Sequence, residues 1–417
     1  MFNTVKEAIQ WIEVQIKFKP KTDLVRMKKA YDMLNIDLTG IKKVHVAGTN
    51  GKGSVCSYIT HILMEASYKV GTYTSPYLVR FNERIKVQFE DISDDDLLVL
   101  INQIYDFNIR FEKEYHEFLS FFELLTLMSL IHFSNQKVDV IVMEVGLGGS
   151  LDATNVLNYD VSLITSIGFD HMKQLGNTLE SILYNKLGIV KPYHHLITTV
   201  DPSLHEQCVV HCMNQKATFE LYSQKHLRVI SHNPIRFIHD HTIYELKLLG
   251  DYQHLNALIS IKAIHYLFPK ISTHKIQNGL KKATWPGRLE EIAPQIYIDG
   301  AHNTHAIDAL HSLRETTFKG KNIFVLFSAL GDKDILGMIE KVKSFANEIT
   351  LTSFPDVRYL DLSPYASASI KFISDPFDAV KFIYKKLKEN DILLILGSLH
   401  FAGYMKSQES NIKTAIL

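Results

Sequence analysis

The chain has 417 residues, with 45 Lys and Arg side chains against 45 Asp and Glu side chains, and three cysteines. Its zero net charge, with both signs interspersed, argues against a protein that binds nucleic acid or an anionic membrane, and three cysteines cannot build a disulfide framework. We therefore expect a soluble cytoplasmic protein of two or three domains, and we take a monomer as the default.

Short β-branched runs alternate along the chain with longer segments of helical periodicity, which is typical of a parallel sheet covered by helices on both faces. In the first half, the pattern predicts a strand at 41–47, a helix at 54–66, a buried helix at 118–133, strands at 138–145 and 160–167, and a helix at 178–190. The last helix should end near Pro192, because the residue before a proline disfavours helical torsion angles. The most apolar helical stretch, 124–131, is far shorter than the ~20 residues that span a bilayer, and the N-terminal residues lack the apolar segment of a secretory signal.

The periodicity breaks at Thr284–Arg288, which we take as the boundary between a first domain of residues 1–284 and a second domain of residues 285–417. A second alternating series follows, with strands predicted at 295–299, 322–328, 348–353 and 391–396. The segment from about 220 to 250 is irregular and β-rich, and we interpret it as a hairpin attached to the first domain. The expected fold is α/β, with an N-terminal parallel-sheet domain and a smaller, Rossmann-like C-terminal domain.

A glycine-rich loop lies between the first predicted strand and helix, in the sequence HVAGTNGKGS at 45–54. Glycines let backbone N–H groups close on a phosphate, the helix N-terminus adds positive potential, and Lys52 offers a cation. Ser54 is placed to reach a magnesium ion. The loop is shorter than the common phosphate loop, and Gly53 separates the lysine from the serine. The motif predicts a nucleotide site, and a simple tight turn is the alternative.

Polar side chains also follow the next two predicted strands. Glu144 ends the strand at 138–145 and precedes three glycines, and His171 follows the strand at 160–167. A carboxylate at the end of a buried strand requires compensation, either by a magnesium ion that bridges to phosphate or by an ion pair. Ligands of open α/β sheets bind at the carboxyl ends of the strands, so the glycine loop, Glu144 and His171 should converge.

The second domain repeats this arrangement. DGAHN at 299–303 follows one predicted strand, SALGDKD at 328–334 another, and GSLH at 397–400 a third. Arg288, at the boundary, can neutralise a phosphate or form a solvated salt bridge.

Two clusters have metal-binding residue types without the matching spacing. The sequence contains no second pair of ligands at zinc-site spacing to complement Cys208 and Cys212. We therefore expect the two cysteines to lie on one face of a helix and to pack there as apolar side chains. The triplet His239–His241 is expected to form the tip of an exposed hairpin.

Taken together, these motifs resemble the folylpolyglutamate synthase and dihydrofolate synthase family, which is related to the Mur ligases of cell-wall synthesis. The matching segments are HVAGTNGKGS at 45–54, TSPYLVRFNERI at 74–85, EVGLGGSLDATN at 144–155, SIGFDHMKQLGNTLESI at 166–182, NKLGIVKP at 185–192, GDYQHLNAL at 250–258, WPGRLE at 285–290, DGAHN at 299–303, FSALGDKD at 327–334 and GSLHFAG at 397–403. The resemblance implies an ATP-driven ligase that joins the carboxylate of a folate or of dihydropteroate to the amine of L-glutamate through an acyl phosphate.

The resemblance also implies a role for individual residues. The ATP contacts would be Asn50, Gly51, Lys52, Gly53, Ser54, Asn256, Arg288 and Asp299. Two Mg²⁺ ions are implied, with Ser75 and Glu144 as ligands of the first, and His171 and Lys186 as ligands of the second. Catalysis would depend on Lys52, Glu144, His171 and Lys186, and the implied substrate contacts are Phe122, Asp152, His302 and Ser398.

Lys186 matches a family lysine that is often carboxylated to a carbamate, which turns a cation into an anion that can hold the second magnesium ion. The chain departs from the family around this lysine, because the usual E-K-A-G-I reads NKLGI at 185–189. It also has Ser150 where the family commonly has an arginine, and a serine cannot form the ion pairs of an arginine.

Two other functions stay open at this point. One is a Mur-type ligase that adds an amino acid to a nucleotide-linked precursor of the cell wall, although the segments TSPYLVRFNERI and GSLHFAG are closer to the folate branch. The other is a nucleotide-binding regulatory protein without ligase activity, against which the retained site residues argue. The sequence leaves the acceptor open between dihydropteroate, tetrahydrofolates and both.

Overall fold

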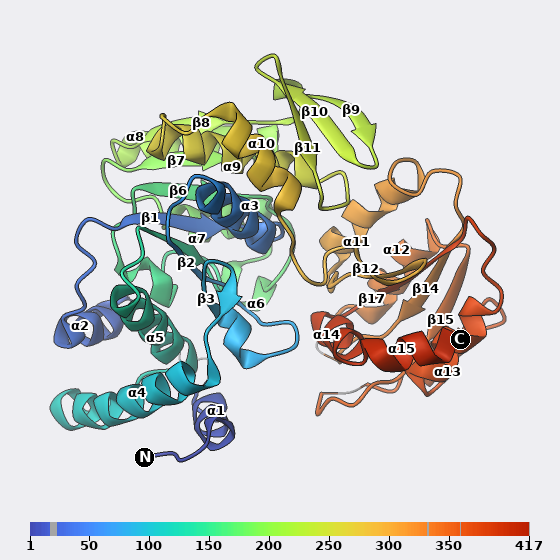
Figure 1. Cartoon of the computed structure of the whole chain (residues 1–417), viewed down its shortest axis with the longest axis horizontal. Coiled ribbons are helices and arrows are strands. Elements are labelled where there is room, and N and C mark those ends of the chain that lie inside the picture. Colours follow the sequence, from blue (N-terminus) through green and yellow to red (C-terminus); the bar gives the residue numbers. More distant parts are fainter. Residues whose placement is uncertain (17–22, 332, 359, 417) are drawn as a thin grey trace. The chain divides into compact units, whose positions relative to one another are not determined.

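The computed structural model describes residues 1–16, 23–331, 333–358 and 360–416. The chain forms two compact units, which Figure 1 shows with most of their elements labelled. The first unit contains Met1–His226 and Leu255–Lys282, and the second contains Leu227–His254 and Ala283–Leu417. The chain therefore passes from one unit to the other three times.

The first unit is built on a sheet with strand order β4-β3-β2-β5-β1-β6-β7-β8 in the described part of the chain. Its strands are β1 (Lys42–Ala47), β2 (Val70–Tyr73), β3 (Ile85–Val87), β4 (Glu90–Asp91), β5 (Val140–Glu144), β6 (Val161–Ile164), β7 (His195–Thr198) and β8 (Thr218–Leu221). The strands from β2 to β8 in this order are parallel, and β3 and β4 extend one edge in antiparallel pairing. The central strands β5 and β6 carry near-continuous apolar runs because helices cover both faces of the sheet.

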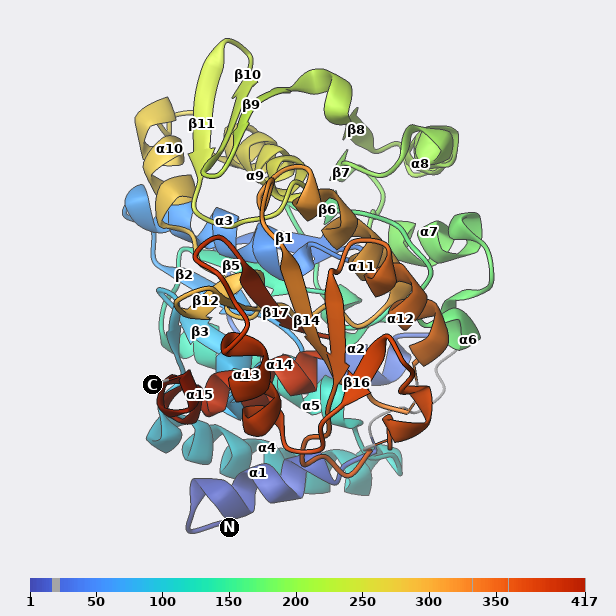
Figure 2. The same ribbon diagram turned by 90° about the vertical axis from the view of Figure 1, so that its right-hand side faces the viewer.

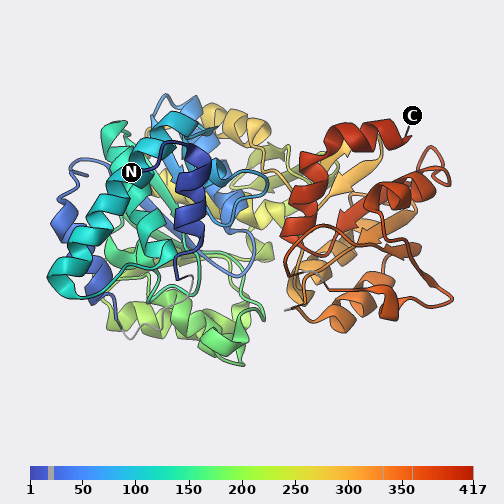
Figure 3. The ribbon, with the colours of Figure 1, turned by 90° about the horizontal axis from the view of Figure 1, so that it is seen from below.

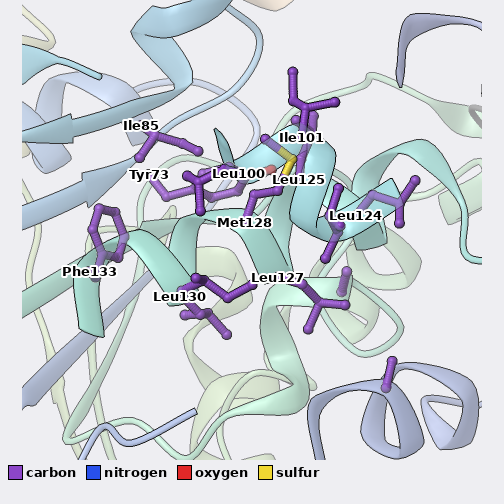
Figure 4. Packing of buried hydrophobic residues seen from close by; sticks show 14 of the residues in the cluster. Tyr73, Ile85, Leu100, Ile101, Leu124, Leu125, Leu127, Met128, Leu130 and Phe133 are labelled. Carbon is purple, nitrogen blue, oxygen red and sulfur yellow. The ribbon is translucent and has the colours of Figure 1, made fainter. Parts of the chain in front are cut away.

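Helices of the first unit are α1 (Val5–Glu13), α2 (Val25–Leu34), α3 (Lys52–Glu65), α4 (Asp94–Tyr115), α5 (Phe121–Asn135), α6 (Met172–Leu175), α7 (Leu179–Leu187), α8 (His205–Asn214), α9 (Gln253–Leu267) and α10 (Thr273–Lys282). On one face of β2, Gly71 lies against the ring of Phe133 in α5, and on the other face the hydroxyl of Thr72 bonds that of Thr60 in α3. Helices α1, α2, α4 and α5 share one hydrophobic core with β2 and β5, part of which is drawn in Figure 4.

The second unit has a sheet with strand order β12-β13-β17-β14-β15-β16 over its described residues. Its elements are β12 (Glu290–Ala293), β13 (Ile296–Ile298), α11 (Thr304–His311), β14 (Ile323–Phe327), α12 (Ile335–Lys343), β15 (Glu348–Leu351), β16 (Ile370–Phe372), α13 (Pro376–Tyr384), β17 (Ile392–Leu396), α14 (Leu399–Ser407) and α15 (Glu409–Ile416). Only β12 pairs in the antiparallel direction among these described strands. The twist of this sheet can be followed in Figures 2 and 3.

The segment predicted to be a hairpin is a separate antiparallel sheet of β9 (Arg228–His232), β10 (Ile235–His239) and β11 (Thr242–Leu246). We expected it on the first domain, but residues 227–254 fold with the second unit. The physical reason is apolar contact, because Leu249 and Tyr252 pack against the hydrophobic core of the second unit. The predicted hairpin tip is confirmed, since Asp240 and His241 form the turn between β10 and β11.

The other predicted elements are present, with shifted ends. Helix α3 begins at Lys52, two residues early, because Gly51 with a φ of 92° turns the chain into the helix. Helix α7 ends at Leu187, before the expected proline boundary, with Gly188 as its C-terminal cap. Cys208 and Cys212 are buried on α8, as predicted. In the described ranges, every helix is too short or too polar to cross a bilayer.

Candidate functional site

The strands that precede the predicted site residues are neighbours in the first sheet, in the order β2, β5, β1 and β6. Ser75 follows β2, Glu144 ends β5, the glycine loop at 48–51 follows β1, and His171 lies seven residues beyond β6. Because these strands are parallel, their carboxyl ends lie at one edge of the sheet. The predicted convergence on this edge is confirmed for the strand ends.

The glycine loop is held by the segment that follows β6. The backbone N–H of Thr49 donates to the carbonyl of Ser166 at 2.7 Å, and the hydroxyl of Thr165 donates to the carbonyl of Asn50 at 2.6 Å. Gly48 has a φ of 148°, and a Cβ atom there would lie 1.8 Å from Oγ1 of Thr165. Only glycine fits this close approach.

Gly48→Ala is therefore expected to weaken ATP binding at least about tenfold, because the loop must move away from Thr165 to accept the methyl group. Isothermal titration calorimetry with a non-hydrolysable ATP analogue measures this. Gly40→Ala is the matched control, since Gly40 also has a positive φ, of 76°, but a Cβ atom there meets nothing within 4 Å. Equal affinities of the two variants for the ATP analogue would contradict the requirement for glycine at position 48.

Two lysines converge on one carbonyl of the loop. Nζ of Lys52 donates to the carbonyls of Gly48 and Thr49, at 3.2 Å each. Nζ of Lys186, on α7, donates to the same Gly48 carbonyl at 2.9 Å, and Lys186 is only 4% exposed. Burial lowers the pKa of Lys186 to about 7, and the positive charge of Lys52 acts in the same direction. Near neutral pH, a large fraction of Lys186 is therefore a neutral amine.

Glu144 and Ser75 meet at the same edge. Glu144 is 5% exposed, and its carboxylate accepts the backbone N–H of Ser75 at 2.9 Å. The buried carboxylate of Glu144 and the hydroxyl that Ser75 carries are hard oxygen groups of the kind that Mg²⁺ prefers. The residue types at this edge thus fit a magnesium ion, which Glu144 and Ser75 would hold.

His171 is the predicted metal ligand with the weakest structural support. Its side chain is half-exposed, and its Nε2 lies 3.9 Å from the carboxylate of Asp170. Among the described residues, no group of three or more His, Cys, Asp and Glu side chains is arranged to hold a metal ion. The ligand set of the second magnesium ion therefore stays a prediction.

A cavity of about 590 Å³ opens beside Ser75. Phe122, a predicted substrate contact, lines it, and its ring lies where a Cβ atom at Gly146 would be, so the glycine lets the ring lie on the loop backbone. The residues that line the cavity are Ser75, Pro76, Arg84, Ser120, Phe121, Phe122, Gly146, Leu147, Gly148, Gly149, Leu151, Asp152, Ala153, Lys173, Gln174, Leu175 and Asn185. The aromatic rings and glycine backbone suit a flat, largely apolar ligand.

Asp152, another predicted substrate contact, also borders this cavity. Its carboxylate accepts the backbone N–H groups of Gly146 at 3.1 Å, Leu147 at 3.0 Å and Thr154 at 3.0 Å. These bonds hold the loop that follows β5. Contact between Asp152 and a substrate stays a prediction.

Ser150 replaces the arginine that is common in the family, and the structure gives it a local role. Its hydroxyl donates to the carbonyl of Asn185 at 3.0 Å, and a Cβ atom at Gly188 would lie 1.9 Å from that hydroxyl. The loop after β5 therefore packs directly on the C-terminal end of α7, the helix that carries Lys186.

Asn256 lies on α9, within the first unit, and contacts the glycine loop. A Cβ atom at Gly51 would lie 2.5 Å from Oδ1 of Asn256, and Gly51 has a positive φ of 92°. The structure thus brings this predicted ATP contact beside the loop, although the two are about 200 residues apart in the sequence.

The second unit gathers the remaining predicted residues in the same way. Asp299 follows β13, which neighbours β17, and Ser398 follows β17. Asp299 is 3% exposed and accepts backbone N–H groups from Leu289 and Ala301. Burial raises the pKa of Asp299, and the positive charge of Arg288 opposes this effect.

His302 and Ser398 have local bonding partners. The Nδ1 atom of His302 lies 2.8 Å from the carbonyl of Gly300, and the hydroxyl of Ser398 caps α14 by accepting the N–H of His400 at 3.2 Å. Their predicted contact with substrate stays a prediction. Asp332, in the motif SALGDKD, lies outside the described residues.

Sequence reasoning missed Arg84, which lines the cavity together with Phe121. For Phe121, the sequence leaves stacking on a pterin and packing in the core both open. The available signal was the sequence FNERI at 81–85, where an arginine closely follows an aromatic residue and precedes a buried strand.

Comparison with known proteins gives consistent matches over the whole chain. The Mur ligase middle domain matches residues 46–264, and the glutamate ligase domain of Mur ligases matches residues 287–399. A protein of Bacillus subtilis described as dihydrofolate synthase/folylpolyglutamate synthase is 37% identical, over 98% of this chain and 100% of the relative.

Solved structures also match this chain over almost its whole length. FolC of Escherichia coli, in complex with DHPP and ADP, has a TM-score of 0.86 and 26% identity, and the match covers 99% of both chains. A bifunctional folylpolyglutamate synthase/dihydrofolate synthase of Yersinia pestis, complexed with AMPPNP and a manganese ion, has a TM-score of 0.85 and 26% identity, over 97% of this chain and 98% of that chain.

Proposed function

Because the chain belongs to the folylpolyglutamate synthase and dihydrofolate synthase family of Mur ligases, we propose that it joins a folate or dihydropteroate carboxylate to the amine of L-glutamate with the energy of ATP. The observation that carries this proposal is the position of Ser75. This residue lines the cavity of about 590 Å³ and bonds to the buried Glu144. Glu144 in turn pairs along β5 with Val46, just before the phosphate loop. These contacts support an acceptor site and a nucleotide site at the same edge of the sheet.

In the proposed reaction, an oxygen of the acceptor carboxylate attacks the γ-phosphorus of ATP and ADP leaves, which gives an acyl phosphate. The glutamate amine then attacks the acyl carbon, phosphate leaves, and an amide remains. Asn50–Ser54 hold the ATP phosphates through backbone N–H groups and the Lys52 ammonium. Asn256, Arg288 and Asp299 contribute further ATP contacts, and His302 and Ser398 contact the substrates.

Ser75 and Glu144 would hold a magnesium ion, which supplies charge shielding for the phosphates when it is bound. His171 and Lys186 would serve a second ion. The neutral amine of Lys186, favoured by its pKa of about 7, is the form that attacks the carbon of CO2 and loses a proton to become a carbamate. A high-resolution density map of the protein crystallised with bicarbonate tests this, and an unmodified lysine there would contradict it.

We also propose that the protein is a cytoplasmic monomer whose partners are its small-molecule substrates. The functional division is proposed after residue 284, with ATP binding assigned mainly to residues 1–284 and glutamate ligation to residues 285–417. The match of the Mur ligase middle domain to residues 46–264 and of the glutamate ligase domain to residues 287–399 supports this division.

The test is ligation of labelled L-glutamate with Mg-ATP, run in parallel with dihydropteroate and with a tetrahydrofolate as acceptor. We expect ATP-dependent product with at least one acceptor. Product with tetrahydrofolate alone identifies a polyglutamate-extending enzyme, and product with both identifies a bifunctional enzyme. Folded, ATP-binding protein that forms no product with either would contradict the proposal and favour the Mur-type or regulatory function.

A further inference from the structure

Arg84 is a buried cation at the wall of the cavity. It ends the short 3₁₀ helix η1 (Phe81–Arg84), is 7% exposed and lines the cavity together with Phe121. Its guanidinium carbon lies 4.9 Å from the ring centroid of Tyr77, 5.5 Å from that of Phe121 and 5.6 Å from that of Phe81. Aromatic faces therefore surround much of its charge.

No hydrogen bond or ion pair of the Arg84 side chain is found within the described ranges, and its buried Nε has no acceptor there. Two other arginines of the first unit, Arg26 and Arg80, differ in this respect. Arg26 bonds both carboxylate oxygens of Glu123, at 3.0 and 3.2 Å, and Arg80 bonds Asp94 at 2.9 Å. Contacts with aromatic rings offset only part of the cost of burying a charge, and a buried donor without an acceptor carries a further cost. This cost calls for an acceptor that binds from the cavity.

We propose that Arg84 is the recognition residue of this cavity and donates a pair of hydrogen bonds to a planar, oxygen-bearing group of the ligation acceptor. The planar fork of a guanidinium matches such a group, which is either a ring carbonyl of the pterin or a carboxylate of the benzoyl-glutamate part. The rings of Phe121 and Phe122 on the adjoining wall suit the flat remainder of the same ligand. The inference rests on the proposed function, since it takes the acceptor to be a folate.

Arg84→Met tests the inference, because methionine fills similar space among the rings without charge or donors. We expect KM for the acceptor to rise at least about tenfold, the value for the loss of one charged hydrogen bond or more, with ATP affinity unchanged. We also expect the variant to unfold at the same or a higher temperature than the parent protein, because an arginine whose charge has no bonded acceptor contributes no ion pair. A purely structural role would instead lower the unfolding temperature and affect both substrates.

Arg80→Met is the matched control on the same segment, since Arg80 is exposed and does not line the cavity. Its acceptor KM should stay within about twofold of the parent value. Arg84→Lys is a second variant that keeps the charge but loses the planar fork. It should fold and still show a raised acceptor KM, so the inference stays testable if Arg84→Met does not fold.

Equilibrium binding of a free pterin and of p-aminobenzoylglutamate identifies the recognised group. If the Arg84 variants bind the free pterin more weakly than the parent protein does, but bind p-aminobenzoylglutamate equally well, Arg84 recognises the ring carbonyl. If only p-aminobenzoylglutamate binds more weakly to the variants, Arg84 recognises a carboxylate. If the parent protein ligates glutamate and both Arg84 variants behave like Arg80→Met, this inference is overturned while the proposed function stands. If the parent protein ligates glutamate to neither acceptor, the proposed function is contradicted, and the inference about Arg84 is overturned with it because it depends on that function.

Discussion

Lys52→Ala and Glu144→Ala are each expected to lower kcat about a thousandfold or more and to leave the protein folded. Lys52 supplies the loop's cation at the N-terminus of α3, and Glu144 supplies the buried carboxylate beside Ser75. Groups that stabilise developing charge in a site closed to water typically contribute factors of this size. Steady-state ligation of labelled glutamate measures the loss, and circular dichroism confirms the fold.

The matched controls for these variants are Lys6→Ala and Glu90→Ala. Both residues are exposed, on α1 and β4, away from the edge where the site residues meet. Their kcat values should equal that of the parent protein. A variant at Lys52 or Glu144 that keeps full activity would remove that residue from the site.

Lys186→Met is expected to remove ligase activity and to raise stability at the same time. Shifting the pKa of a lysine from 10.5 to about 7 corresponds to about 5 kcal/mol that folding spends on burying the amine. Methionine avoids this cost but loses the hydrogen bond to Gly48, so we expect a net gain of about 2 kcal/mol in the free energy of unfolding of the first unit. Urea unfolding at several pH values measures the gain.

The pH dependence of this gain follows from the direction of the shift. Between about pH 7 and pH 10.5 the unfolded chain holds a proton on Lys186 that the folded protein has released, so the stability of the parent protein rises with pH. The advantage of Lys186→Met should therefore be full below pH 7, fall by about 1.4 kcal/mol per pH unit above it, and change sign near about pH 8.5. Lys191→Met is the control, because Lys191 also donates to buried carbonyls but lies away from the phosphate loop, and this variant should stay active.

Much of the site could be predicted because its residues follow strands. Continuous apolar runs mark β5 and β6, the glycine loop marks the end of β1, and parallel strands place their carboxyl ends together. Glu144 and the loop were found in this way. Their exact contacts, such as the shared carbonyl of Gly48 under Lys52 and Lys186, depend on how α3 and α7 pack, and no local pattern encodes that packing.

Other features could not be predicted from the sequence because they depend on contacts between segments that are far apart in the chain. Arg84 resembles an ordinary charged residue in the sequence, and only the surrounding rings of Tyr77, Phe81 and Phe121 show that it is buried. The expectation that the whole segment from about 220 to 250 belongs to the first domain was wrong from residue 227 onward, because apolar contacts to distant residues decide which core such a β-rich segment joins. Leu249 and Tyr252 decide this in favour of the second unit.

The return of the chain to the first unit at residues 255–282 has a consequence for synthesis on the ribosome. Helix α10 packs backbone against backbone on α3, since a Cβ atom at Gly279 would lie 2.5 Å from Cα of Ile62. This helical packing partner of α3, the helix that begins at the phosphate loop, is therefore translated only some 220 residues later. A ribosome-bound fragment that ends before α10 should thus expose the apolar side of α3, and a truncation after residue 226 should be prone to aggregation rather than yield a minimal nucleotide-binding protein.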